Sequence, residues 1–141
     1  MKKYLMIGVL MLFSLIGCDP YYWMEDYEGY WFLKNTTDKP LVISYSGKQQ
    51  TITPGDSTAI LETYTILASN IVPSFRDIQV IDSICVYDTT GKELCKWRQE
   101  NMDIRVRNAF NETLWSFWAI PGYSTWVYDI CNEDFKQNQV L

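Results

Sequence analysis

The sequence has 141 residues, a formal net charge of −5 and no histidine. The missing histidine excludes Ser-His-Asp and Cys-His catalytic arrangements and removes the commonest metal ligand, while the acidic balance disfavours nucleic acid as a partner. Aromatic residues make up 16% of the chain, which favours a sheet core over disorder.

The first predicted element is a targeting segment. Lys2 and Lys3 precede an uncharged, mostly apolar run over positions 4–17, as in a signal peptide. As a helix, this run would span about 21 Å, short of the roughly 30 Å hydrocarbon core. It ends in the letters LIGC at Cys18, which resembles the bacterial lipobox. The resemblance implies that residues 1–17 are a cleaved lipoprotein signal peptide and that the Cys18 thiol carries a lipid. An ordinary secretory signal or a core helix is the alternative.

A lipid on Cys18 would give the protein a membrane partner. Each buried methylene contributes about 0.8 kcal/mol, so one fatty chain binds a membrane marginally, whereas two or three bind it durably. Cleavage before Cys18 would also remove both lysines of the leader, leaving 124 residues with a formal charge of −7. A chain of that length suits one domain.

The rest of the chain predicts a lipidated tether over residues 18–29 and one all-β domain over residues 30–141. In the latter, apolar side chains recur mostly at every second position, which is typical of half-buried strands. Pro54-Gly55 has the residues of a type II turn, and residues 67–77 allow a short helical turn. The expected strands are Trp31–Leu33, Leu41–Tyr45, Gln50–Thr53, Ser57–Ile66, Ile78–Tyr87, Lys92–Arg98 and Trp126–Ile130. The pattern therefore predicts a single β-sandwich of about seven strands.

A hairpin is predicted around residues 88–91, with the sequence Asp-Thr-Thr-Gly. If residues 89–91 form a three-residue loop with Gly91 in the left-handed backbone conformation, Cys85 pairs with Cys95. Their Cα atoms would then be about 4.5 Å apart. This separation allows a disulfide. A two-residue turn would instead pair Cys85 with Lys96, and two reduced cysteines are the other alternative. Cys131 makes the count odd once the lipidated cysteine is set aside, so at least one thiol stays free or pairs between chains.

Several short motifs together carry a resemblance to a known group of proteins. Besides the lipobox, they are the Pro-Gly-Asp turn at 54–56, GKELCKW at 91–97, RNAFNETLW at 107–115 and YDICNEDF at 128–135. Together they look like the small uncharacterised β-sandwich lipoproteins of Bacteroidales-type bacteria. The resemblance implies an immunoglobulin-like or transthyretin-like sandwich, lipid-anchored at the bacterial outer membrane on its periplasmic or cell-surface face. It implies no activity.

Carboxylates are the only candidate catalytic groups. Cys85 and Cys95 are ten positions apart, without the short spacings of a zinc site, and the sequence has no glycine-rich phosphate loop. We therefore expect no metal, no cofactor and no enzymatic activity. A small carboxylate-based hydrolase is the second alternative, although turns and solvated positions account for the same residues. These residues are Asp82, Asp88, Glu93, Asp129, Glu133 and Asp134.

Four tryptophans are candidate glycan-stacking residues: Trp97, Trp115, Trp118 and Trp126. Core packing is the competing explanation, because sandwich domains bury many aromatic side chains. Two or three rings exposed on one sheet face would favour the glycan function. The preferred hypothesis is a lipid-anchored, non-enzymatic envelope protein that acts as a binding or structural module for a protein or polysaccharide partner. A glycan-binding accessory lipoprotein is the first alternative.

Three triplets resemble the O-glycosylation acceptor pattern of Bacteroidota envelope proteins. They place the candidate acceptors Ser57, Ser83 and Thr89 directly after an aspartate. Turn chemistry explains all three equally well, because an aspartate in a turn accepts hydrogen bonds from backbone N–H groups. The sequence therefore predicts either O-glycosylation or a structural turn at these three positions.

Overall fold

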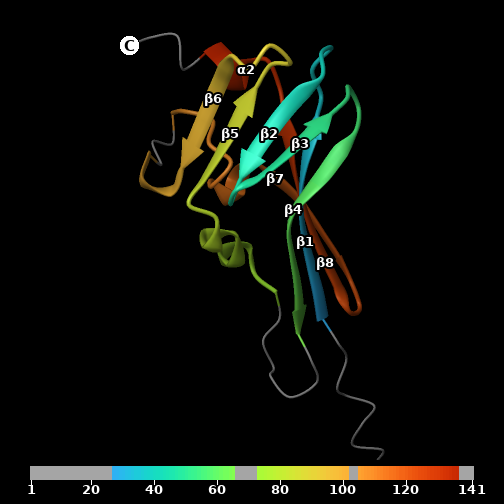
Figure 1. The fold of residues 1–141 in the computed structure, drawn as a ribbon. Coiled ribbons are helices and arrows are strands. Elements are labelled where there is room, and N and C mark those ends of the chain that lie inside the picture. The colour runs from blue at the N-terminus through green and yellow to red at the C-terminus, as the bar shows by residue number, and fades with distance from the viewer. Residues whose placement is uncertain (1–26, 66–72, 102–104, 137–141) are drawn as a thin grey trace, which may run out of the picture.

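The computed structural model describes residues 27–65, 73–101 and 105–136. The predicted signal peptide, the lipid site Cys18 and tether residues 18–26 lie outside these ranges. The described chain forms a β-sandwich of two four-stranded sheets (Figure 1). The predicted all-β class is thereby confirmed, with eight strands instead of about seven.

The first sheet, sheet A, has the strand order β4-β1-β8-β7. Its strands are β1 (Tyr27–Asn35), β4 (Ser57–Thr65), β7 (Trp115–Ile120) and β8 (Tyr123–Ile130). β1 and β8 run parallel, whereas β1 with β4 and β7 with β8 are antiparallel. β1 already includes residues 27–29, which the sequence assigned to the tether, because Tyr27 pairs with Thr65 of β4.

The second sheet, sheet B, has the strand order β3-β2-β5-β6. Its strands are β2 (Leu41–Tyr45), β3 (Lys48–Ile52), β5 (Ser83–Tyr87) and β6 (Glu93–Arg98). All of its neighbouring strands pair antiparallel. These strands are shorter than β1 and β4, and one end of sheet A therefore extends beyond sheet B (Figure 1).

A short helix replaces the first part of the strand expected over 78–87. Among the described residues, the short helices η2 (Phe75–Val80), η3 (Gln99–Asn101) and η4 (Glu112–Leu114) lie between strands, and α2 (Glu133–Lys136) follows β8. At the start of η2 the Ser74 N–H donates to the Asp77 carboxylate (3.0 Å) and the Asp77 N–H to the Ser74 carbonyl (3.0 Å). These bonds satisfy donors at the helix start and position Ile78 in the core. β5 consequently begins only at Ser83.

The β5–β6 turn has the predicted conformation. Gly91 has a φ of +86°, the left-handed conformation that glycine adopts without steric cost. The Asp88 N–H donates to the Lys92 carbonyl at 3.0 Å, and Tyr87 pairs with Glu93 as expected. The three-residue loop is therefore confirmed.

The disulfide predicted between Cys85 and Cys95 is wrong. The register shifts beside Val86, so that Leu94 is an extra residue of β6, Val86 pairs with Cys95 and Cys85 pairs with Lys96. Such a β-bulge places two residues of one strand opposite one of the other. Because successive side chains alternate between faces, the two thiols point to opposite sides of sheet B. Both are buried free cysteines, as in the reduced alternative.

The core lies between the two sheets and is built from alternate residues of each strand. Trp31 and Leu33 of β1, together with Tyr128 and Ile130 of β8, are fully buried. The rings of Trp31 and Trp126 stack with centroids 4.4 Å apart and an interplanar angle of 10°. The residues between these positions must point to the other side of sheet A.

Candidate ligand-binding face

The face of sheet A that points away from sheet B carries the candidate site, and we call it the outer face. Directly paired residues share a face, and the registers align Ser116 with Val127 and Val127 with Phe32. The outer face consists of Glu28, Tyr30, Phe32, Lys34, Ser57, Ala59, Glu62, Tyr64, Ser116, Trp118, Ile120, Tyr123, Thr125, Val127 and Asp129. Lys34 and Asp129 share the row at one end, Glu28 lies at the other end, and Glu62 lies in the row of Tyr30 and Trp118.

A concave region, the hollow, occupies one half of the outer face. It has a volume of about 460 Å³ and is lined by Phe32, Lys34, Gly55, Ser57, Ser116, Trp118, Val127 and Asp129. That volume falls within the roughly 300–1,000 Å³ of ordinary small-molecule pockets. The hollow therefore combines an apolar centre with polar groups at its border, which is the usual composition of a ligand site.

Aromatic rings supply the apolar part of this face. Trp118 on the edge strand β7 keeps 52% of its surface exposed. Phe32 is half-buried, and its ring stacks on Tyr30 with centroids 6.1 Å apart. The Tyr30 hydroxyl donates a hydrogen bond to the Glu28 carboxylate, and this bond, with burial, raises the pKa of Tyr30 to about 12. The phenol thus stays neutral at physiological pH.

Two charged side chains border the hollow. Lys34 and Asp129 are paired positions of the parallel strands β1 and β8, and both are exposed. Within the described ranges neither side chain forms an ion pair. The Asp129 carbonyl accepts a hydrogen bond from Arg107 (3.0 Å), which restrains the backbone of β8 at this position. The Lys34 ammonium is thus a donor and the Asp129 carboxylate an acceptor that a ligand can reach.

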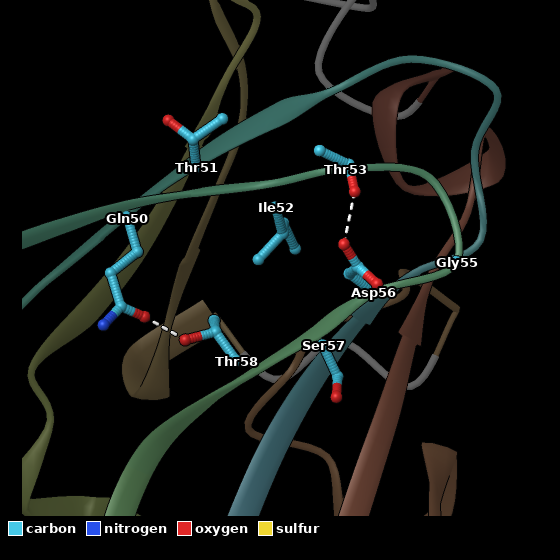
Figure 2. A pocket seen from close by; sticks show the side chains of 8 residues that line it. All are labelled: Gln50, Thr51, Ile52, Thr53, Gly55, Asp56, Ser57 and Thr58. Atoms are coloured by element: carbon cyan, nitrogen blue, oxygen red, sulfur yellow. Dashed lines mark hydrogen bonds between the residues drawn. The ribbon is translucent and has the colours of Figure 1, made fainter.

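A polar groove lies beside the hollow, between β3 and β4 (Figure 2). It measures about 590 Å³ and is lined by Gln50, Thr51, Ile52, Thr53, Gly55, Asp56, Ser57 and Thr58. Its side chains bond to one another: the Thr58 hydroxyl donates to Gln50 and the Thr53 hydroxyl to Asp56 (Figure 2). Ser57 lines both concavities. Because four of its polar side chains already bond to one another, the groove is a weaker ligand site than the hollow.

Three of the four tryptophans predicted to stack on glycans are buried instead. Trp97, Trp115 and Trp126 are only 3%, 8% and 4% exposed, and the Trp115 indole N–H donates to the Ala109 carbonyl at 2.7 Å. For these three residues the core-packing alternative is correct, because they occupy inward positions. Of the four, only Trp118 occupies an outward-facing position of its strand, so that its ring lies on the outer face.

The sequence analysis named Ser57 and Asp129 for other roles, and it missed Phe32 and Lys34. Both of these line the hollow, yet neither a phenylalanine nor a lysine was among the residue types considered for binding. The alternation of side chains along the strand would have identified Phe32 and Lys34. Trp31 and Leu33 are two positions apart, are strongly apolar and face the core. Their neighbours must therefore face outward.

The candidate carboxylate Asp134 has a structural role. It is 2% exposed and accepts hydrogen bonds from the Arg107 Nε (3.0 Å), the Tyr128 hydroxyl (2.6 Å) and the Cys131 N–H (2.8 Å). Arg107 also lies 5.3 Å from the centroid of the Tyr128 ring. Burial, and then the nearby Asp134 carboxylate, raise the pKa of Tyr128. This network fixes α2 against sheet A.

The remaining cysteine lies next to this network. Cys131 is half-buried, and its thiol is 3.5 Å from an oxygen of Asp134. Burial and the nearby carboxylates raise the pKa of Cys131 to about 11, so the thiol is protonated at neutral pH. A protonated thiol is a weak nucleophile.

The three predicted O-glycosylation acceptors have different surroundings. Ser57 and Thr89 are exposed, whereas Ser83 is half-buried. In the triplet that contains Thr89, the Asp88 carboxylate accepts hydrogen bonds from the N–H groups of Thr90 (2.8 Å) and Lys92 (3.0 Å). Turn chemistry therefore accounts for this aspartate, and glycosylation stays a prediction.

Residues 27–65, 73–101 and 105–136 contain no group of three or more cysteine or carboxylate side chains placed to hold a metal ion. They also contain no helix with the length and apolar character needed to cross a bilayer. Comparison of the chain with protein families, curated proteins and solved structures finds no match.

Proposed function

We propose that this protein is a lipid-anchored, non-enzymatic binding module of the bacterial outer membrane, with the outer face of sheet A as its ligand surface. One observation carries the proposal: a single face combines the exposed ring of Trp118 with the charges of Lys34 and Asp129, which form no ion pair with any residue that the structure describes. Exposed apolar patches rimmed by polar residues mark interaction sites.

The sequence supports the other parts of the proposal. The apolar run ending in LIGC at Cys18 supports the lipid anchor, and the resemblance to Bacteroidales-type lipoproteins supports the envelope. The lack of histidine removes the commonest general acid-base group. The charged residues of the hollow are one cation, Lys34, and one anion, Asp129. This pair suits binding of a polar ligand more than catalysis, which would need two carboxylates.

The anchor is tested on the protein isolated from membranes of its native bacterium. Mass spectrometry of the mature N-terminus should find Cys18 as the first residue, with a lipid mass added. The Cys18→Ala variant should lose that mass and leave the membrane fraction. A chain that begins elsewhere, or a wild-type protein that stays in the aqueous fraction, would contradict the anchor. Protease treatment of intact cells then distinguishes the periplasmic from the cell-surface face.

The ligand surface is tested in cells with a photo-crosslinking amino acid placed at Ser116, beside Trp118 in the hollow. The matched control carries the same amino acid at Val80, which is exposed on η2 away from the outer face. We expect an adduct of discrete mass from Ser116 and none from Val80. Equal labelling at both positions, or none at either, would remove the outer face as the ligand surface.

A further inference from the structure

Resting on the function proposed above, we propose that the hollow binds a neutral polysaccharide, with one sugar ring stacked on Trp118 and hydroxyl groups of the polymer bonded by Lys34 and Asp129. The proposal stands on three observations: the exposed ring, a donor and an acceptor that line the same hollow and form no ion pair among the described residues, and the charge of the outer face. Each limits the class of ligand further.

The ring of Trp118 gives the stacking surface. Its side chain is 52% exposed, and Phe32 and Val127 form the apolar floor beside it. An indole face carries negative partial charge, whereas the C–H bonds on one side of a pyranose ring carry positive partial charge. A sugar can therefore lie flat against the indole while its hydroxyl groups remain at its perimeter.

The border of the hollow matches those hydroxyl groups. The Lys34 ammonium only donates hydrogen bonds, the Asp129 carboxylate only accepts them, and the hydroxyls of Ser57 and Ser116 do both. All four side chains are exposed and line the hollow. Adjacent sugar hydroxyls each donate and accept, so they can satisfy a cation and an anion at the same time. An apolar peptide segment would leave these groups without partners.

The charge of the outer face selects a neutral sugar over an acidic one. Lys34 is the one cation on the outer face as defined above, against the three carboxylates Glu28, Glu62 and Asp129. The whole chain is acidic as well, with a formal charge of −5. Uronic acids and sulfated sugars would therefore be repelled, whereas an uncharged sugar avoids this repulsion.

The outer face offers room for more than one sugar unit. Beyond the hollow, toward the β7–β8 turn, Tyr64, Ile120 and Tyr123 remain exposed. Ile120 pairs with Tyr123, and this row follows that of Trp118 along the strands. A second ring in line with the first fits a polymer chain that runs along the face, not a single monosaccharide.

The test uses the full-length chain in detergent and isothermal titration with named polysaccharides. The neutral ones are laminarin, arabinoxylan, galactomannan and dextran, and polygalacturonate is the acidic comparator. We expect at least one neutral polymer to bind and polygalacturonate not to bind. Trp118→Ala should weaken the binding about tenfold or more through loss of the stacked ring. Lys34→Met and Asp129→Asn should each weaken it by about two- to tenfold, as expected for one lost hydrogen bond.

Phe117→Ala is the matched control variant. Phe117 follows Ser116 on the same strand and is 57% exposed, close to the value for Trp118, but it lies on the opposite face. It should leave the affinity unchanged within about twofold. Equal losses in Phe117→Ala and Trp118→Ala, binding of polygalacturonate alone, or no binding of any polymer would overturn the inference. A Ser116 crosslink to a protein, including a second copy of this chain, would also overturn it while leaving the proposed function intact.

Discussion

The two faces of sheet A use aromatic residues in opposite ways. On the inner face, Trp31 and Trp126 stack and are closed off from solvent. On the outer face, Trp118 and Phe32 come from the strands β7 and β1 of the same sheet but border an open hollow. Aromatic content alone therefore predicts neither packing nor binding. The position of each ring within the alternation of its strand decides on which face of the sheet it lies.

The largest expected effect is on the inner face. Trp31→Ala removes a fully buried ring from the middle of the sandwich, and large-to-small changes of this kind cost about 3–5 kcal/mol of unfolding free energy. Urea denaturation followed by far-ultraviolet circular dichroism would measure it. A loss below about 1 kcal/mol, the size of an ordinary surface change, would mean that the inner face is not the core.

The second effect concerns the carboxylate that holds Tyr128 of the inner face. Asp134→Asn keeps the shape of the side chain but removes the charge that Arg107 and Tyr128 contact. We expect a loss of about 2–3 kcal/mol, as for hydrogen bonds to a buried charged group. The neighbouring exposed Glu133→Gln is the control and should change stability by less than about 0.5 kcal/mol. Similar losses in both variants would contradict a special role for Asp134.

A third effect is a pH dependence on the alkaline side. Burial, assisted by Asp134, raises the pKa of Tyr128, so the folded protein keeps a proton that the unfolded chain loses above about pH 10. The stabilisation is complete below that pH and declines as the pH rises, by up to about 1.4 kcal/mol per pH unit. Tyr128→Phe should make the decline between about pH 10 and 11.5 shallower, as measured by denaturation at each pH. An unchanged slope would show that Tyr128 does not contribute.

The smallest effect is expected on the outer face. Trp118→Ala should cost about 1 kcal/mol or less, because half of the side chain is already in water. Thermal unfolding of this variant beside Trp31→Ala makes the comparison direct. If the two variants lost similar stability, Trp118 would be a packing residue, and its exposed ring would need no ligand to explain it.

Much of the fold follows from local sequence patterns. The alternation over residues 41–45 predicts β2 with the observed bounds, and the glycines of the predicted turns, Gly55 and Gly91, both have positive φ. The first residues of β5 could not be predicted this way, because the apolar spacing of 78–82 fits a strand as well as it fits η2. The hydrogen bonds of Ser74 and Asp77 settle that choice.

The candidate site was less predictable than the fold. Residues far apart in the sequence meet in the hollow, such as Lys34 and Asp129, and only the parallel pairing of β1 with β8 brings them together. A parallel pairing between the first and last strands leaves no local signature, unlike a hairpin. The β-bulge beside Val86 also left no signal in the sequence. Its one extra residue moves every later side chain of β6 to the opposite face from the one that the regular register predicts.

Hydroxyl-radical footprinting, read by mass spectrometry, tests the central claim about the two faces most directly. In the full-length protein, Trp118 should be oxidised readily, while Trp31, Trp97, Trp115 and Trp126 should be protected. Adding the neutral polymer that binds should then protect Trp118 but leave labelling at Phe117 unchanged. Rapid oxidation of the four inward tryptophans, or equal protection of Trp118 and Phe117 by the polymer, would contradict the separation of packing and binding between the faces.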